Sequence, residues 1–123
     1  LDVGLLGAMS ELPAESILEG NDIFVEFKGA LTEQYVLQQL ISDTPYTPYY
    51  YGNEKATFEQ DFLIQKAKSI VPIEVKAEQN IRSHSLKTYC EKFQPEEAVR
   101  FSTLKYKEQE RMVNMPLYAV CNL

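Results

Sequence analysis

The fold of this chain is decided by residues 58–76, which read FEQDFLIQKAKSIVPIEVK. Two runs within this segment, Phe58–Ile64 and Ile70–Lys76, have the β-branched and aromatic content that is typical of strands. The residues between them are few and polar, and so short a connection predicts an antiparallel hairpin. We expect the turn of this hairpin to be centred between Ala67 and Lys68.

Charged residues stand at facing positions of the predicted hairpin. Side chains alternate between the faces of a strand, so Glu59 and Asp61 share one face. The predicted turn sets Asp61 opposite Glu74 and Glu59 opposite Lys76, with Cβ atoms about 5 Å apart. Opposed carboxylates repel, and a divalent cation between them would reverse that effect because Mg²⁺ prefers oxygen ligands. A turn shifted by one residue would instead leave Asp61 facing Ile73, so this pairing is a prediction that the structure tests.

Length and composition are those of one domain. The chain has 123 residues, of which 45% are hydrophobic, so we expect a single core over residues 22–123 and an N-terminal packing segment over residues 1–21. No apolar run approaches the roughly 20 residues of a membrane helix, and no membrane association is predicted. The two cysteines, Cys90 and Cys121, are neither a disulfide framework nor a zinc site, which predicts a reducing, cytoplasmic setting.

The charge is unevenly distributed along the chain. The net charge of −6 argues weakly against nucleic acid as a partner. Residues 1–60 carry ten acidic and two basic side chains, whereas residues 61–123 carry eight acidic and ten basic side chains. Any surface that faces phosphate should therefore come from the second half. The alternative is that these lysines and arginines simply solvate that half.

A long helix is predicted before the hairpin, because apolar residues recur at helical spacing from Asp22 to about Ile41. Glu33 falls on the apolar stripe of this helix, together with Val36 and Leu40. A charged group on a buried face needs a partner, since its desolvation is costly. Glu33 is therefore a candidate functional residue. The alternative is that it lies near a helix start and complements the helix dipole.

The other core elements follow from the same patterns. Tyr49–Tyr51 is predicted as a strand, and its tyrosines could stack on bases, although a strand with one packed face is the commoner reading. Ser83 is a suitable N-cap for an amphipathic helix that runs to Phe93. Ala98–Ser102 then reads as a strand, and a strand, a crossover helix and a strand predict a parallel pair.

The two ends of the chain carry weaker signals. Leu1–Met9 is apolar and is expected to pack on this domain or on one further upstream, because Leu1 is not an initiator methionine and suggests a longer protein. Ser10–Gly20 is predicted to be a short helix. The charged segment Tyr106–Arg111 is predicted to be a solvated loop, and Met115–Cys121 a short final helix, with a strand as the alternative.

The order of these elements resembles a known fold. A helix with Glu33, three strands that carry Asp61 and then Glu74-x-Lys76, a helix and a strand are similar to the αβββαβ core of the PD-(D/E)xK nuclease superfamily. This resemblance implies an α/β restriction-endonuclease-like fold, in which helices flank a mixed central sheet. Glu-x-Lys alone is a weak signal, because many surface strands contain it, but the motif and the element order together are more specific.

A second resemblance covers nearly the whole chain. Its motifs are Leu1–Leu6, Phe27–Val36, Glu59–Phe62, Pro72–Lys76, Ser85–Lys87 and Met115–Tyr118. They are similar to the C-terminal domain of a large family of prokaryotic AAA-type ATPases, a domain that carries a domain-of-unknown-function label. The resemblance implies an ATPase and a linking domain upstream, and a possible homo-oligomer through that ATPase.

The superfamily resemblance also implies roles for individual residues. Asp61 and Glu74 match the positions of the metal ligands, for Mg²⁺ or Mn²⁺, and Lys76 matches the catalytic lysine. Glu33 matches a helix carboxylate of resolvase-like members and would be a third metal ligand. The implied activity is metal-dependent hydrolysis of phosphodiester bonds in DNA, with Asp61, Glu74 and Lys76 as the catalytic residues.

Two further residues are assigned supporting roles by the resemblance. Glu59 fits the Glu-x-Asp form of the ATPase-linked group and could pair with Lys76, and Lys87 matches a basic position of the next helix. Two alternatives to cleavage stay open. One is a catalytically inactive module that docks on its ATPase or on another protein, and the other is a domain that binds DNA without cutting it.

Overall fold

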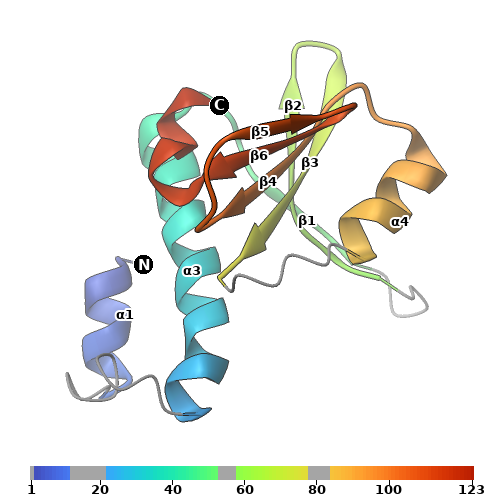
Figure 1. Cartoon of the computed structure of the whole chain (residues 1–123). Coiled ribbons are helices and arrows are strands. Elements are labelled where there is room, and N and C mark those ends of the chain that lie inside the picture. Colours follow the sequence, from blue (N-terminus) through green and yellow to red (C-terminus); the bar gives the residue numbers. More distant parts are fainter. Residues whose placement is uncertain (1, 12–21, 53–57, 78–83) are drawn as a thin grey trace.

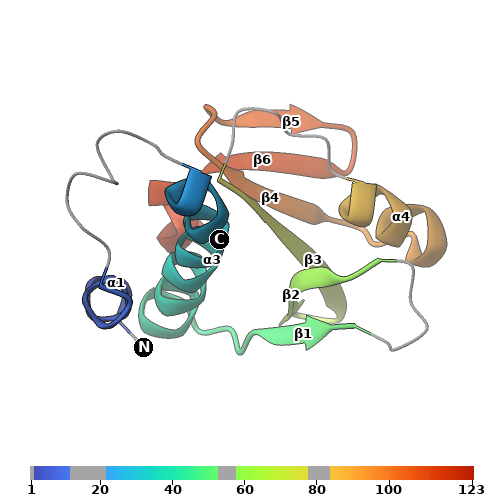
Figure 2. The same cartoon turned by 90° about the horizontal axis from the view of Figure 1, so that it is seen from below.

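The computed structural model describes residues 2–11, 22–52, 58–77 and 84–123. Within these residues, six strands form one sheet, with α3 and η1 on one face and α4 on the other (Figure 1, Figure 2). The mixed α/β class predicted from the sequence is confirmed. The elements are α1 (Val3–Met9), α3 (Asp22–Asp43), β1 (Tyr49–Tyr51), β2 (Gln60–Lys66), β3 (Ser69–Lys76), α4 (His84–Phe93), β4 (Ala98–Ser102), β5 (Lys107–Gln109), β6 (Met112–Pro116) and the 3₁₀ helix η1 (Leu117–Asn122).

The strands lie in the order β1-β2-β3-β4-β6-β5. β1, β2 and β3 form an antiparallel meander, and α4 then crosses over so that β4 pairs parallel with β3. β6 is parallel to β4, and β5 closes the sheet as an antiparallel edge strand. The predicted order of a helix, three strands, a helix and a strand is confirmed, and so is the parallel pairing across the crossover helix.

The β2–β3 hairpin has the predicted register. Phe62 faces Ile73, and the pairing continues without a shift to Lys66 and Ser69. The turn holds only two residues and not the predicted five, because both strands extend further than expected and Ala67 adopts a positive φ of 55°. Proline is tolerated in β3, since the ladder to β4 begins only after it, at Ile73.

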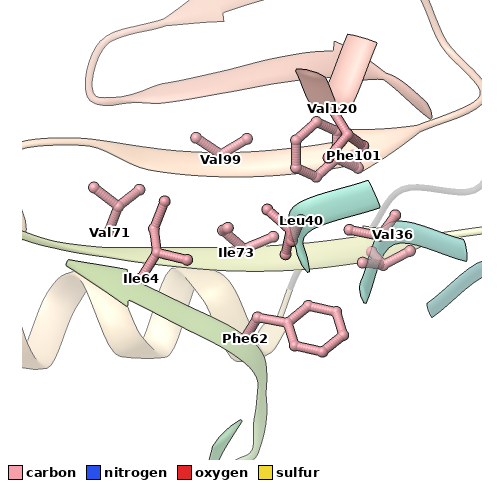
Figure 3. Packing of buried hydrophobic residues seen from close by; sticks show 10 residues of the cluster. Val36, Leu40, Phe62, Ile64, Val71, Ile73, Val99, Phe101 and Val120 are labelled. Atoms are coloured by element: carbon pink, nitrogen blue, oxygen red, sulfur yellow. The ribbon is translucent and has the colours of Figure 1, made fainter. Parts of the chain in front are cut away.

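The hydrophobic core lies between α3 and one face of the sheet (Figure 3). Alternate residues of β2, β3 and β4 point into it, as the two-residue period of a strand requires. Val36 and Leu40 come from α3, one helical turn apart, and Val120 comes from η1. The buried strand residues are Phe62, Ile64, Val71, Ile73, Val75, Val99 and Phe101.

Aromatic rings attach α4 to the opposite side of the sheet. Tyr89 and Phe93 lie one helical turn apart on α4, and both make edge-to-face contacts with Tyr51 of β1 at 5.6 and 5.8 Å between ring centroids. Phe58 stacks on the same tyrosine at 5.9 Å. The amphipathic face predicted for this helix is thus confirmed, while its predicted cap, Ser83, lies outside the described residues.

Two predictions for the second half of the chain are corrected. Tyr106–Arg111 is not simply a loop, because its central residues Lys107–Gln109 form the fully exposed edge strand β5. Their charges had suggested a loop, but charged side chains suit an edge strand that faces water. Met115 and Pro116 end strand β6, and helical structure begins only at Leu117, as a 3₁₀ helix.

The N-terminal segment packs on this domain, as one of its two predicted alternatives stated. Asp2 caps α1 by accepting a hydrogen bond from the Leu5 N–H at 3.0 Å. Gln38 of α3 accepts a hydrogen bond from the Val3 N–H at 3.0 Å. Most of the predicted helix Ser10–Gly20 lies outside the described residues. In the described part of the chain, no helix is both long and apolar enough to cross a membrane.

Gly29 lies inside the continuous helix α3. A Cβ atom at this position would meet no other atom within 4 Å. We therefore predict that Gly29→Ala raises the free energy of unfolding by about 0.5–1 kcal/mol, because alanine restricts the unfolded chain and favours the helix.

Chemical denaturation measures this change. The reverse substitution at the next residue, Ala30→Gly, is the matched control, because Ala30 is exposed on the same helix. It should lower the free energy of unfolding by a similar amount. A destabilising Gly29→Ala would contradict this helix geometry.

Candidate active site

The regular pairing of β2 is interrupted near Phe62 on both sides, toward β1 and toward β3. On the β1 side, Tyr49 faces Leu63, and Tyr51 faces Gln60. Two steps along β1 therefore match three steps along β2, which is a bulge-type shift of one residue. Bulges re-aim side chains and are common beside active sites. The predicted alternation of faces nevertheless continues along β2, because Gln60, Phe62 and Ile64 are buried whereas Asp61 and Leu63 are only partly buried.

On the other side, the ladder between β2 and β3 ends at Phe62 and Ile73, although both strands continue beyond that pair. Side chains replace main-chain pairing there. Asp61 accepts a hydrogen bond from the Val75 N–H through Oδ2 at 2.7 Å. We call this region, residues 60–61 of β2 and 73–76 of β3, the fork.

Glu74 and Lys76 lie on the β3 arm of the fork. Lys76 Nζ is 3.4 Å from Glu74 Oε1, so the two side chains form an ion pair. The Glu74 side chain is almost fully buried, whereas a third of the Lys76 side chain is exposed. The second carboxylate oxygen of Glu74, Oε2, is buried and has no hydrogen-bond partner among the described residues. An unsatisfied buried carboxylate oxygen is costly, so Glu74 Oε2 lowers the stability of the fork.

Glu33 reaches the fork from the long helix. The C-terminal end of β3 lies beside α3 in both views (Figure 1, Figure 2). Glu33 itself is exposed, contrary to the buried position predicted for it, but neighbouring atoms still desolvate its carboxyl group. The desolvation of this carboxyl group raises the pKa of Glu33, the charge of Asp61 raises it further, and the charge of Lys76 lowers it.

The fork is an electrostatically unfavourable place for carboxylates. Burial raises the pKa of Asp61, the hydrogen bond from Val75 lowers it, and the charge of Glu74 raises it again. Lys76 lowers the pKa of both Asp61 and Glu33 and pairs with Glu74, and the charge of Glu74 also acts on the buried Arg100, so two cations face three acidic side chains. The structure thus brings Glu33, Asp61, Glu74 and Lys76 into one neighbourhood, and a further cation would relieve the repulsion among the carboxylates.

The carboxylates are not arranged as a closed metal cage. Within the described ranges, no group of three His, Cys, Asp or Glu side chains is positioned to hold a metal ion. Asp61 uses only Oδ2 in a hydrogen bond among the described residues, and Glu74 Oε2 has no such bond. These two residues therefore supply the oxygen atoms that are available for a hard cation.

Two predicted supporting residues do not join this neighbourhood. Glu59 is exposed, and in the described part of the chain Lys76 pairs with Glu74 instead of with Glu59. Lys87 is exposed on α4 and lies 3.8 Å from Glu91 of the same helix. Lys87 lines an open groove of about 950 Å³ between α4 and the β5–β6 hairpin.

The structure adds residues that the sequence analysis did not single out. Gln60 is buried and hydrogen-bonds to β3 through its side chain. Arg100 is buried on β4 directly beside Glu74, and its Nε donates to Asn114 Oδ1 at 3.1 Å. The signal for both was a polar residue within an otherwise apolar strand pattern, such as Arg100 between Val99 and Phe101.

The Asp61 carboxylate combines a useful hydrogen bond with an unfavourable charge. A raised carboxyl pKa means that folding favours the protonated form, so the ionised form at neutral pH lowers stability. We predict that Asp61→Asn is at least as stable as the parent chain at pH 7, because it keeps an acceptor for Val75 and removes the charge. Asp61→Ala should lose about 1–3 kcal/mol, since it leaves that buried N–H unsatisfied.

Thermal and denaturant unfolding of the two variants decide this prediction. Equal losses in Asp61→Asn and Asp61→Ala would show that the charge itself stabilises the fork, contrary to the electrostatic account.

Comparison with known proteins gives one match, to a protein family. No curated protein and no solved structure matches the chain. Residues 28–120 match a family described as a domain of unknown function, DUF4143, and this range includes each of the candidate residues. The match covers most of the chain, and the protein therefore belongs to the DUF4143 family.

Proposed function

We propose that this domain is a metal-dependent nuclease, which hydrolyses phosphodiester bonds in DNA with Asp61, Glu74 and Lys76 as its catalytic residues. The observation that carries the proposal is the buried Glu74 Oε2, which has no hydrogen-bond partner among the described residues and lies where charges of Asp61, Glu74 and Lys76 interact. Perturbed carboxylates around one lysine at a strand end are a pattern of catalytic sites.

The element order supports the same function. The sequence of α3, β1, β2, β3, α4 and β4 is the αβββαβ order of restriction-endonuclease-like nucleases, which the PD-(D/E)xK resemblance implies. Asp61 on β2 and Glu74-x-Lys76 on β3 stand on the two neighbouring strands that this fold uses for its motif. We further propose that the domain is the C-terminal module of an AAA-type ATPase, which rests on the sequence resemblance alone.

The donor atoms of the fork fit a hard divalent cation. Mg²⁺ is often bound through one or two carboxylates and completed by water and substrate phosphate, so a closed cage of three acidic residues is not required. Asp61 and Glu74 would hold Mg²⁺ or Mn²⁺, and Glu33 would contribute directly or through water. Such an ion supplies Lewis-acid polarisation of the scissile phosphate and lowers the pKa of a bound water.

The protein side chains have distinct tasks in this proposal. The Val75 N–H orients the Asp61 carboxylate through its hydrogen bond at 2.7 Å. Lys76 exchanges its partner Glu74 for the substrate, where its ammonium group stabilises the charge that develops on the phosphate or orients the attacking water. Glu33 adds negative charge from α3 and thereby favours a cation at the fork.

One observation favours a different function, namely a catalytically inactive module that docks on its ATPase or on another protein. Glu74 already has a partner in Lys76, and Asp61 already has one in Val75, so both carboxylates could serve a purely structural network. This function predicts a folded domain without metal affinity. DNA binding without cleavage would instead give salt-dependent binding that Lys76→Ala does not change.

Metal affinity separates the nuclease from the docking module. We predict that the chain binds Mn²⁺ in a calorimetric titration, and that Asp61→Asn and Glu74→Gln each weaken this binding at least tenfold, because each removes a charged ligand. Lys76→Ala should bind Mn²⁺ as well as the parent chain or better, since it removes a competing cation. Equal Mn²⁺ binding by the parent chain, Asp61→Asn and Glu74→Gln would rule out this site.

Cleavage tests the role assigned to Lys76. With Mn²⁺ and plasmid, single-stranded or branched DNA, Lys76→Ala should reduce the rate of cleavage by about 100- to 1000-fold, the usual cost of losing one group that stabilises transition-state charge. Lys66→Ala is the matched control, because Lys66 lies at the turn end of the same hairpin and pairs with Glu97 at 3.3 Å. Survival of all three substrates with the parent chain and with the full-length protein would favour the docking module.

A further inference from the structure

Gln60 is a buried polar residue on the β2 arm of the fork, and the proposed mechanism does not use it. Its side chain is 2% exposed and donates from Nε2 to the main-chain oxygen of Ile73 at 2.7 Å. The orientation of the amide is fixed chemically, because a carbonyl oxygen accepts only from the NH₂ end of the group. Its own oxygen, Oε1, is buried and has no partner among the described residues.

The hydrogen bond of Gln60 stands next to that of Asp61. Gln60 and Asp61 are consecutive in β2, and they bond to Ile73 and Val75 of β3, two residues apart. Alternate residues of a strand direct their main-chain groups toward the same neighbouring strand, so both bonds cross the same gap. The two side chains together bridge β2 and β3 where the regular ladder has ended.

The bridge also coincides with the shift in the β1–β2 pairing. Gln60 faces Tyr51 in β1, and the extra residue of β2 lies between Gln60 and Leu63. A bulge disrupts the ladder locally and bends the bulged strand, and here β2 has no ladder pair with β3 beyond Phe62 and Ile73. The Gln60 amide connects the bulged strand to the main chain of β3, on the residue directly before Glu74.

We propose that Gln60 is a positioning residue that fixes the separation of β2 and β3 at the fork, and thereby sets Asp61 relative to Glu74. The unsatisfied Oε1 agrees with this role, because a side chain selected only for stability would not leave a buried oxygen without a partner. This inference rests on the proposed function for its effect on metal binding, but the bridge itself is a property of the fold.

The test replaces Gln60 by methionine, which has nearly the same length and shape but cannot donate to Ile73. The matched control is Gln65→Met, because Gln65 is an exposed glutamine of the same strand whose side chain reaches only Ala67 in the turn. Hydrogen exchange of the Val75 amide, followed by NMR, reports the Asp61–Val75 bond without any metal. A Mn²⁺ titration of the same proteins reports the metal ligands.

We expect the Val75 amide to exchange about tenfold faster in Gln60→Met, as for the loss of one hydrogen bond, and at the parental rate in Gln65→Met. Mn²⁺ affinity should fall by about 10- to 100-fold in Gln60→Met alone, which is the usual effect of losing an outer-shell partner. Melting curves confirm that each protein is folded at the assay temperature. If Gln60→Met does not fold, Gln60→Asn replaces it, since its amide is one carbon shorter.

Each outcome has a separate meaning. Unchanged Val75 exchange in Gln60→Met overturns the bridge, whatever the metal does. Faster exchange with unchanged Mn²⁺ affinity overturns the positioning role and leaves Gln60 a structural residue. A parent chain that binds no Mn²⁺ refutes the proposed nuclease, and the exchange measurement still decides whether Gln60 holds the fork.

Discussion

The hydrogen bond from the Val75 N–H to Asp61 is the interaction on which the candidate site depends. An antiparallel ladder normally satisfies such a main-chain donor with a carbonyl group of the neighbouring strand. Here a carboxylate does so, because the ladder between β2 and β3 ends at the pair of Phe62 and Ile73. The exchange brings a charged side chain to the end of the strand pair without leaving the strand unpaired, so one interaction serves both the fold and the site.

The electrostatics of the fork follow from that separation. Three acidic side chains approach one lysine, and burial and mutual repulsion raise the pKa of Asp61 and of Glu33. A domain gains no stability from such an arrangement, and natural proteins keep unfavourable charge clusters mainly where function needs them. The unsatisfied oxygen of Glu74 points the same way, since a structural network would be expected to satisfy its buried atoms.

The sequence predicted the hairpin register correctly because a short turn and a buried face leave only one pairing of β2 with β3. It predicted β4 because Ala98–Ser102 is a short and mostly apolar run, and this strand is buried throughout. It could not predict the shift between β1 and β2, because a bulge adds one residue without a compositional signal when no glycine marks it. Gln60 was missed for a related reason: its role comes from the end of a ladder, and only the three-dimensional pairing shows where a ladder ends.

A crystal structure of the chain soaked in Mn²⁺ tests the central claim most directly, through the anomalous signal of the metal. The account predicts one strong peak at the fork, about 2.1 Å from a carboxylate oxygen of Asp61 and from Glu74 Oε2. It also predicts that Lys76 moves away from Glu74 when the metal binds. The account would be contradicted by saturating Mn²⁺ with no peak between these two residues and with the Glu74–Lys76 ion pair still intact.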